Sequence, residues 1–296
     1  MTNHPFVSRA KAPAGTSTAG ATLIQKLTLA FVYTVFIITA IVVLYPIFWV
    51  IMGSLNPGDT LNATRLVPER LTLSHYVHLF NGTDYGLWFR NTLYIAFWNM
   101  VLSTFLVVTA AYAFSRFRFA GRRQALMTML VLQMFPGFMG MIAIYILLLQ
   151  LGLLDNHWGL ILVYAGGSIP FGAWLVKGYF DSLPRSLEEA AKIDGAGNLT
   201  ILFKVVMPLS RPILVFLAIT NFTGPWMDFI FARLVLRSNS QKTLAVGLFE
   251  MVTGRGNTEF TTFAAGAVIV AVPITILFLL FQKYLVEGLK AGANKG

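Results

Sequence analysis

The chain has no cysteine and few charged residues. Zero cysteines in 296 residues exclude disulfides and thiolate metal sites. Asp, Glu, Lys and Arg make up 11% of the chain, well below the roughly 25% of an ordinary soluble domain. Apolar residues make up 56%, and the mean hydropathy is +0.70. The composition therefore indicates an integral membrane protein.

Signatures of nucleotide binding and of catalysis are also missing. No G-x-x-x-x-G-K-[ST] loop occurs, so the chain lacks that means of holding nucleotide phosphates. Glu188 and Glu189 are adjacent, so their carboxylates lie about 100° apart on a helix. They are therefore not suited to paired acid and base roles. His75 and His78 lie three apart without a third ligand, and we interpret them as solvated histidines. The sequence predicts no active site, no metal and no cofactor on this chain.

Uncharged runs recur along the chain. About 20 apolar residues cross the hydrocarbon core as a helix, and the fifth run is the shortest. We predict an all-α, polytopic membrane protein with six transmembrane helices. The runs span residues 27–58, 91–115, 124–154, 156–176, 212–227 and 260–282.

The basic residues give the orientation. With a cytoplasmic N-terminus, the inner segments hold 15 of the 22 Lys and Arg residues. The positive-inside rule then places both termini in the cytoplasm, with a polar segment between the fourth and fifth helices. These residues are Arg9, Lys11, Lys26, Arg116, Arg118, Arg122, Arg123, Lys177, Arg185, Lys192, Lys204, Arg211, Lys283, Lys290 and Lys295.

The chain divides into three parts. Residues 1–22 are rich in Ala, Gly, Ser and Thr and are expected to form a disordered cytoplasmic tail. Residues 23–288 form the membrane domain. Residues 289–296 form a basic, Gly-rich cytoplasmic tail. Two long outer loops, about 56–88 and 233–259, face the other side.

A polar segment, residues 184–208, is predicted to form two short helices separated by glycines. Ser186 precedes Glu189 by three residues, the spacing of a capping box. The Asp194-Gly195-Ala196-Gly197 run breaks the first helix where Gly adopts positive φ. Asn198 is expected to cap a second helix that runs through Val206, and Pro208 is expected to end it. We define 184–208 as the coupling segment. Leu187, Ala190, Ala191 and Asp194 are expected to share one face of its first helix.

Polar and helix-breaking residues inside the spans leave two interpretations open. No Lys, Arg, Asp or Glu lies at mid-span, whereas ion-coupled transporters use such residues. Most polar side chains there are expected to join helices by hydrogen bonds, and some could line a passage for a neutral, hydroxyl-rich solute. Pro136-Gly137 and Gly224-Pro225 are expected to interrupt the third and fifth spans, as packing kinks or gating hinges. The candidate path residues are Gln133, Pro136, Asn221, Thr223, Gly224 and Pro225.

The outer loop 233–259 has a flexible tip. It is either an ordinary turn or a finger that contacts an external partner. Asp228, before this loop, is expected to be wetted at the outer end of the fifth span. The tip residues are Thr253, Gly254, Arg255, Gly256 and Asn257.

The coupling segment resembles the EAA motif of permease subunits in bacterial ABC importers. The resemblance is carried by Glu189-Ala190-Ala191, by Gly195 four residues later, and by Val205, Met207 and Pro208. Met227-Asp228 stands where the family more often has Asn-Glu. The stretches 91–93, 111–123, 226–229, 244–248 and 282–292 are similar to the carbohydrate-uptake family, and most similar to its maltose and maltodextrin group.

The resemblance implies a heteromeric importer in the bacterial inner membrane. The chain would pair with a homologous permease, two cytoplasmic ATPase subunits that use ATP and Mg, and a periplasmic sugar-binding protein. It would pass a neutral sugar such as maltose or maltodextrin by alternating access. A stand-alone secondary sugar transporter and a non-transporting assembly factor are the rival hypotheses. The residues implied in ATPase coupling are Ser186, Leu187, Glu189, Ala190, Ala191, Asp194, Gly195 and Pro208.

Overall fold

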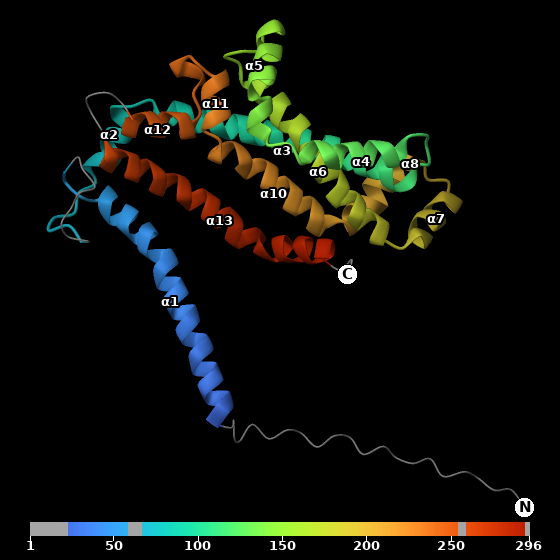
Figure 1. Cartoon of the computed structure of the whole chain (residues 1–296), viewed down its shortest axis with the longest axis horizontal. Coiled ribbons are helices and arrows are strands. Elements are labelled where there is room, and N and C mark those ends of the chain that lie inside the picture. Colours follow the sequence, from blue (N-terminus) through green and yellow to red (C-terminus); the bar gives the residue numbers. More distant parts are fainter. Residues whose placement is uncertain (1–22, 59–66, 254–258, 294–296) are drawn as a thin grey trace, which may run out of the picture. The chain divides into compact units, whose positions relative to one another are not determined.

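The computed structural model describes residues 23–58, 67–253 and 259–293. Within these ranges the chain is helical and has no β-strand (Figure 1). The predicted all-α class is therefore confirmed. The expected N-terminal tail, residues 1–22, lies outside the described residues.

Four helices are long and apolar enough to cross a membrane by themselves. They are α1 (Leu23–Ser54), α3 (Tyr85–Arg116), α6 (His157–Ser182) and α13 (Phe260–Ala293). Two bent pairs also pass as spans if each pair is counted as one: residues 122–133 with 137–150, bent by 95°, and residues 198–209 with 211–227, bent by 87°. The described structure thus holds four candidate spans, or up to six, and their order matches the six predicted runs.

The third predicted span is broken where the sequence indicated. Helix α4 (Arg122–Gln133) ends three residues before Pro136, which precedes a short 3₁₀ turn, η1 (Gly137–Gly140). Helix α5 (Met141–Gln150) follows. Proline disfavours helical geometry in the residue before it, and this accounts for the break.

The expected interruption at Gly224-Pro225 is wrong. Helix α10 (Arg211–Met227) runs through both residues and ends two residues after the proline. Pro225 removes one helical donor, and a side chain of α3 replaces it. Asn99 donates from Nδ2 to the Asn221 carbonyl oxygen at 2.7 Å. Asn221 lies four residues before Pro225, so its carbonyl is the one left without its usual partner.

The first part of α1 forms a unit of its own, up to Trp49. Its most apolar stretch has no buried residues. An apolar helix that is exposed on every side needs lipid or another protein around it.

The second unit, from Val50 onward, has its core between long helices. Helix α3 packs along α6 and α10, and α10 packs along α13 (Figure 1). Val107, Val176 and Ile213 lie in one cluster of buried apolar side chains, one from each of α3, α6 and α10. The shorter helices α2 (Ser74–Asn81), α11 (Ile230–Val235) and α12 (Leu244–Thr253) contribute to two further clusters of buried apolar side chains.

Asp228 is not simply a wetted residue at a helix end. Its carboxylate accepts hydrogen bonds from the backbone N–H of Phe231 at 3.1 Å and of Ala232 at 3.2 Å, and a further one from the Tyr164 hydroxyl. It therefore caps α11 and ties this helix to α6.

Candidate functional site

The coupling segment begins with helix α7 (Arg185–Ile193). The predicted capping box is wrong, because Pro184 occupies the N-cap and no side chain caps the helix. Ser186 lies inside the first turn, two residues too late for the predicted role. Pro184 has φ −60° and an extended ψ of 121°, so its fixed ring starts the helix without a cap.

Helix α7 ends at glycine, as predicted. Gly195 has φ +85°, a conformation that L-residues with a Cβ rarely adopt. The N–H of Gly195 donates to the Lys192 carbonyl at 3.0 Å, and the N–H of Ala196 donates to the Ala191 carbonyl at 2.9 Å. These two bonds form a Schellman motif, which satisfies the last carbonyls of the helix.

The second helical stretch differs in detail from the prediction. It consists of α8 (Asn198–Ile201), a π-helical turn η2 (Leu202–Val206) and α9 (Met207–Leu209). Asn198 begins the helix rather than capping it, since Gly197 is the N-cap. Pro208 lies within the last turn, one residue before its end.

A buried ion pair attaches α7 to the membrane helices. Arg116, at the end of α3, donates from Nε to Glu188 Oε1 at 2.7 Å, and its Nη2 lies 2.5 Å from the same oxygen. Both side chains are 8% exposed. Glu188 is the one buried acidic residue of α7. This role was not predicted, because Glu188 was considered only as half of an acid–base pair.

The same arginine also contacts α6. Its Nη2 donates to the Phe180 carbonyl at 2.8 Å, and its Nη1 lies 3.9 Å from Asp181 Oδ1. Asp181 accepts from Ser115 at 2.6 Å and pairs with Lys177 at 2.5 Å. Arg116 is therefore the common partner of the ends of α3, α6 and α7, and we call these contacts the Arg116 network.

The opposite side of α7 is open. Glu189, Ala190 and Asp194 are exposed, and Leu187 is 46% exposed. Ala191 is half-buried and packs against the core cluster of α3, α6 and α10. The predicted common face is thus split, with Ala191 turned inward and the other three outward.

The candidate path residues do not form one group. Asn221, Thr223, Gly224 and Pro225 follow one another on α10, and Thr223 donates back to the Ile219 carbonyl at 2.9 Å. Gln133 is exposed at the end of α4, a helix that packs against α6. The contact between Asn99 and Asn221 supports the helix-joining interpretation at that position, whereas Asn221 Nδ2 is buried without a partner among the described residues.

A further prediction concerns the tip of the loop 233–259, residues 253–257. Thr253 is the last residue of α12, and its hydroxyl donates to the Phe249 carbonyl at 3.0 Å. Gly254, Arg255, Gly256 and Asn257 lie outside the described residues.

The interpretation of His75 as solvated is wrong. His75 is 7% exposed, its Nε2 lies 2.8 Å from the Asn56 carbonyl oxygen, and its Nδ1 lies 3.3 Å from the Thr261 hydroxyl. It joins the start of α13 to the end of α1 through α2. His78 lies 3.6 Å from Glu259. In the described part of the chain, no three or more ligand-type side chains gather as a metal site.

Comparison with known protein families identifies the family of this chain. The model of the binding-protein-dependent transport system inner membrane component matches residues 103–291, which include α7 and the Arg116 network. The chain belongs to this family of ABC transporter permeases. The permease is 43% identical over 271 residues to the galactooligosaccharides transport system permease protein GanQ of Bacillus subtilis (strain 168), covering 90% of this chain and 96% of GanQ.

Further relatives agree. The permease is 40% identical over 273 residues to the maltodextrin transport system permease protein MalD of Streptococcus pneumoniae, covering 92% of this chain and 97% of MalD. Its structure is similar to a chain of a bacterial ABC transporter involved in the import of the acidic polysaccharide alginate. The TM-score is 0.80 at 27% identity, covering 90% of this chain and 99% of that one. The predicted resemblance to sugar-importer permeases is confirmed.

Proposed function

We propose that the permease is the membrane subunit of an ATP-driven importer for neutral oligosaccharides of the maltodextrin type. In this proposal it pairs with a homologous permease, and two cytoplasmic subunits bind and hydrolyse ATP with Mg. A periplasmic binding protein delivers the sugar. The membrane is the bacterial inner membrane, crossed six times, with both termini and α7 in the cytoplasm.

The observation that carries the proposal is the two-sided character of α7. Its inner side is attached to α3 and α6 by the Glu188–Arg116 ion pair and by Ala191. Its open side exposes Leu187 and Ala190. A helix fixed to two membrane helices on one side and open on the other transmits force from a partner seated on the open side.

The mechanism follows from this attachment. When the two ATPase subunits close around ATP, they draw α7 of this chain and the corresponding helix of the partner permease together. Because α7 is joined to the ends of α3 and α6, these helices rotate with it as a rigid body and expose the path to the outside. ATP and the sugar-loaded binding protein both favour the outward state, since a ligand shifts only an equilibrium between states that it binds differently.

The substrate class is inferred from the relatives and from the spans. The names of the two relatives refer to the transport of galactooligosaccharides and of maltodextrin. The path would be lined by uncharged polar groups, among them Asn221, Thr223 and Gln133, which suit hydroxyl groups. The outer tip at 253–257 is proposed to contact the binding protein, and the tail at 289–296 to contact the ATPase subunits.

The test is uptake by the assembled transporter. The permease, purified with its co-assembling subunits and placed in vesicles, is expected to take up maltodextrin only with ATP, Mg and the binding protein. Ala190→Arg places a bulky charge on the open side of α7 and is expected to abolish uptake. Ala120→Arg, at an exposed alanine between α3 and α4, is the matched control. Uptake driven by an ion gradient without ATP, or unchanged uptake by Ala190→Arg, would overturn the proposal.

A further inference from the structure

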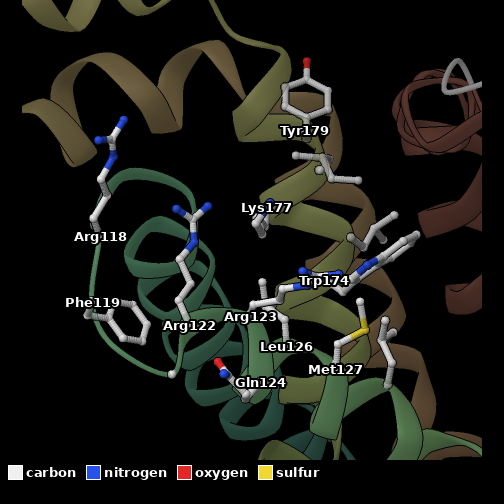
Figure 2. Close-up of a pocket in the computed structure, with 15 residues that line it drawn as sticks. Arg118, Phe119, Arg122, Arg123, Gln124, Leu126, Met127, Trp174, Lys177 and Tyr179 are labelled. Carbon is white, nitrogen blue, oxygen red and sulfur yellow. The ribbon is translucent and has the colours of Figure 1, made fainter.

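A cavity of about 630 Å³ lies beside the Arg116 network, between α4 and α6 (Figure 2). Its walls come from the turn between α3 and α4, from α4, from the last part of α6 and from Ile213 of α10. Its size falls within the range of roughly 300–1,000 Å³ typical of small-ligand sites. None of the residues assigned to ATPase coupling or to the sugar path lines it.

One end of this cavity is strongly basic. Arg118, Arg122, Arg123 and Lys177 line it, and no Asp or Glu is among its described lining residues. Lys177 is paired with Asp181. The three arginines have no carboxylate within ion-pair distance in the described part of the chain. Figure 2 shows the Arg118 and Arg122 side chains extending in the same direction, toward the end where Tyr179 lies.

The start of α4 adds to the attraction for an anion. Gly121, with φ +81°, is the N-cap, and no side chain caps the first turn. Gly121 and the three residues after it all line the cavity. Backbone N–H groups at a helix start carry partial positive charge and favour bound anions. Three guanidinium groups that have no carboxylate partner in the described part of the chain therefore line the same cavity as this helix start. Arg122 also donates to the Phe117 carbonyl oxygen at 3.4 Å.

The other end of the cavity is apolar. Leu126, Met127, Leu130 and Trp174 line it, and Met127 and Trp174 are 53% and 47% exposed. These residues stand on predicted spans, a few residues from the basic end. A basic end next to an exposed apolar end matches an amphiphile with an anionic head, and it does not match a small free anion.

We propose that this cavity binds an anionic phospholipid of the cytoplasmic leaflet. The phosphate lies against Arg118, Arg122 and Arg123, and an acyl chain follows Met127 and Trp174. The proposal rests on the orientation given under the proposed function. Because the lipid bridges α4 to α6, and α6 leads directly into α7, its head joins the first helix of a bent span to the element that receives the ATPase.

The test counts the lipids that remain bound. The assembled transporter is purified from vesicles containing phosphatidylglycerol and phosphatidylethanolamine, and its retained lipids are measured by native mass spectrometry. Arg122→Gln with Arg123→Gln removes two charges from the cavity. Lys204→Gln with Arg211→Gln removes two charges from exposed positions outside it and is the matched control. Each basic residue near an anionic surface contributes about a fivefold factor, so the cavity variant is expected to lose about 30-fold in preference for phosphatidylglycerol.

The outcomes separate the possible occupants. Loss of the preference in the cavity variant alone supports the proposal. Equal retention by the cavity variant and the wild type overturns it, as does equal loss in both variants, which indicates diffuse surface charge. Displacement of the lipid by inorganic phosphate alone indicates a free-anion site and also overturns it. A photo-crosslinker at Met127 that captures a companion polypeptide instead of lipid assigns the cavity to a protein interface.

This readout is independent of transport. Lipid retention needs neither ATP nor sugar, so its failure leaves the proposed function standing, and a failure of ATP-driven uptake leaves the lipid result interpretable.

Discussion

Asn99 of α3 donates a hydrogen bond from its side-chain amide to the backbone carbonyl of Asn221 in α10, at 2.7 Å. Pro225 stands four residues further along α10 and has no N–H to offer this carbonyl. Helix α10 nevertheless continues through the proline. The amide of a neighbouring helix thus replaces a bond that the proline removes, and it joins the two helices at the same point.

This relationship predicts a non-additive pair of substitutions. Asn99→Leu is expected to destabilise the permease by about 0.6–1.7 kcal/mol, the range for hydrogen bonds between membrane helices. In the Pro225→Ala background the cost is expected to be smaller, because a backbone N–H at position 225 then serves the Asn221 carbonyl. Thermal unfolding of the four proteins of this cycle measures the coupling. Strictly additive costs would show that the two residues act independently.

The buried pair of the Arg116 network gives a second prediction. Glu188→Gln leaves the Arg116 guanidinium buried without a carboxylate on α7. Removing one partner of a buried pair costs about 3–5 kcal/mol, so the assembled transporter is expected to unfold at a lower temperature and to lose sugar-stimulated ATP hydrolysis.

Glu189→Gln is the matched control, because Glu189 is adjacent but exposed. It is expected to change stability by less than about 0.5 kcal/mol. If the two variants lose the same stability, α7 is not held by the buried pair.

The glycine turn after α7 allows a paired comparison. Gly195→Ala places a Cβ at φ +85° and is expected to cost about 1–2 kcal/mol of stability. Gly197 has φ −73° and no atom within 4 Å of an added Cβ, so Gly197→Ala is expected to be neutral or slightly stabilising. Chemical denaturation of the two variants measures the difference, and equal stability would contradict the strained geometry.

A close contact between α12 and α3 predicts a packing defect between these two helices. A Cβ added at Gly247 would overlap the ring of Trp88. Gly247→Ala is therefore expected to destabilise the permease by about 1–3 kcal/mol through overpacking. Gly86→Ala, on α3 with nothing within 4 Å of the new Cβ, is expected to stabilise the helix slightly. Thermal unfolding in detergent distinguishes the two, and a stable Gly247→Ala protein would contradict the contact.

Asp155 predicts acid sensitivity of the α5–α6 turn. Burial raises the pKa of Asp155, but hydrogen bonds from Ser238 and from the Arg237 N–H offset this, and its pKa lies below the usual value. Its carboxylate accepts the N–H of Arg237 at 2.8 Å and of Ser238 at 2.9 Å. A carboxyl group with a lowered folded pKa contributes stability above its unfolded pKa and loses that contribution as pH falls through the folded pKa.

The turn is therefore expected to loosen as the pH falls below about 4. The protection factors of amides in the turn between α5 and α6, which are exchange rates relative to the intrinsic rate at each pH, check this. Asp155→Asn is expected to remove the loss of protection at low pH and to lower protection at neutral pH, whereas Asp194→Asn, at an exposed position, keeps the wild-type profile. Protection factors in the wild type that do not fall with pH would contradict the role of the carboxylate.

The elements that follow from local sequence were predicted well. Uncharged runs long enough to cross a membrane became long helices or bent pairs, because apolar length is a property of the run itself. Gly195 was predicted because a left-handed turn favours glycine wherever it occurs. The break at Pro136 was predicted because this proline lies inside the run that forms the third span.

What was missed depends on partners far along the chain. The role of Glu188 requires Arg116, 72 residues earlier, and nothing local indicates which of two adjacent glutamates turns inward. Pro225 was expected to break its helix, since the sequence does not show that Asn99 completes the bond. A sequence signal existed only for His75, whose neighbours in α2 place it beside Leu79 on an inward face. The cavity beside α4 brings together residues from three separate segments and has no single motif.

The π-helical turn at Leu202–Val206 holds a wider loop of backbone than an α turn. Each residue advances a helix by about 100°, so losing one residue inside α10 turns every later side chain to a different neighbour. Losing one residue at the π turn relaxes it to ordinary α geometry and preserves the register on both sides. Length variation among relatives should therefore concentrate at this turn and spare the helices that flank it.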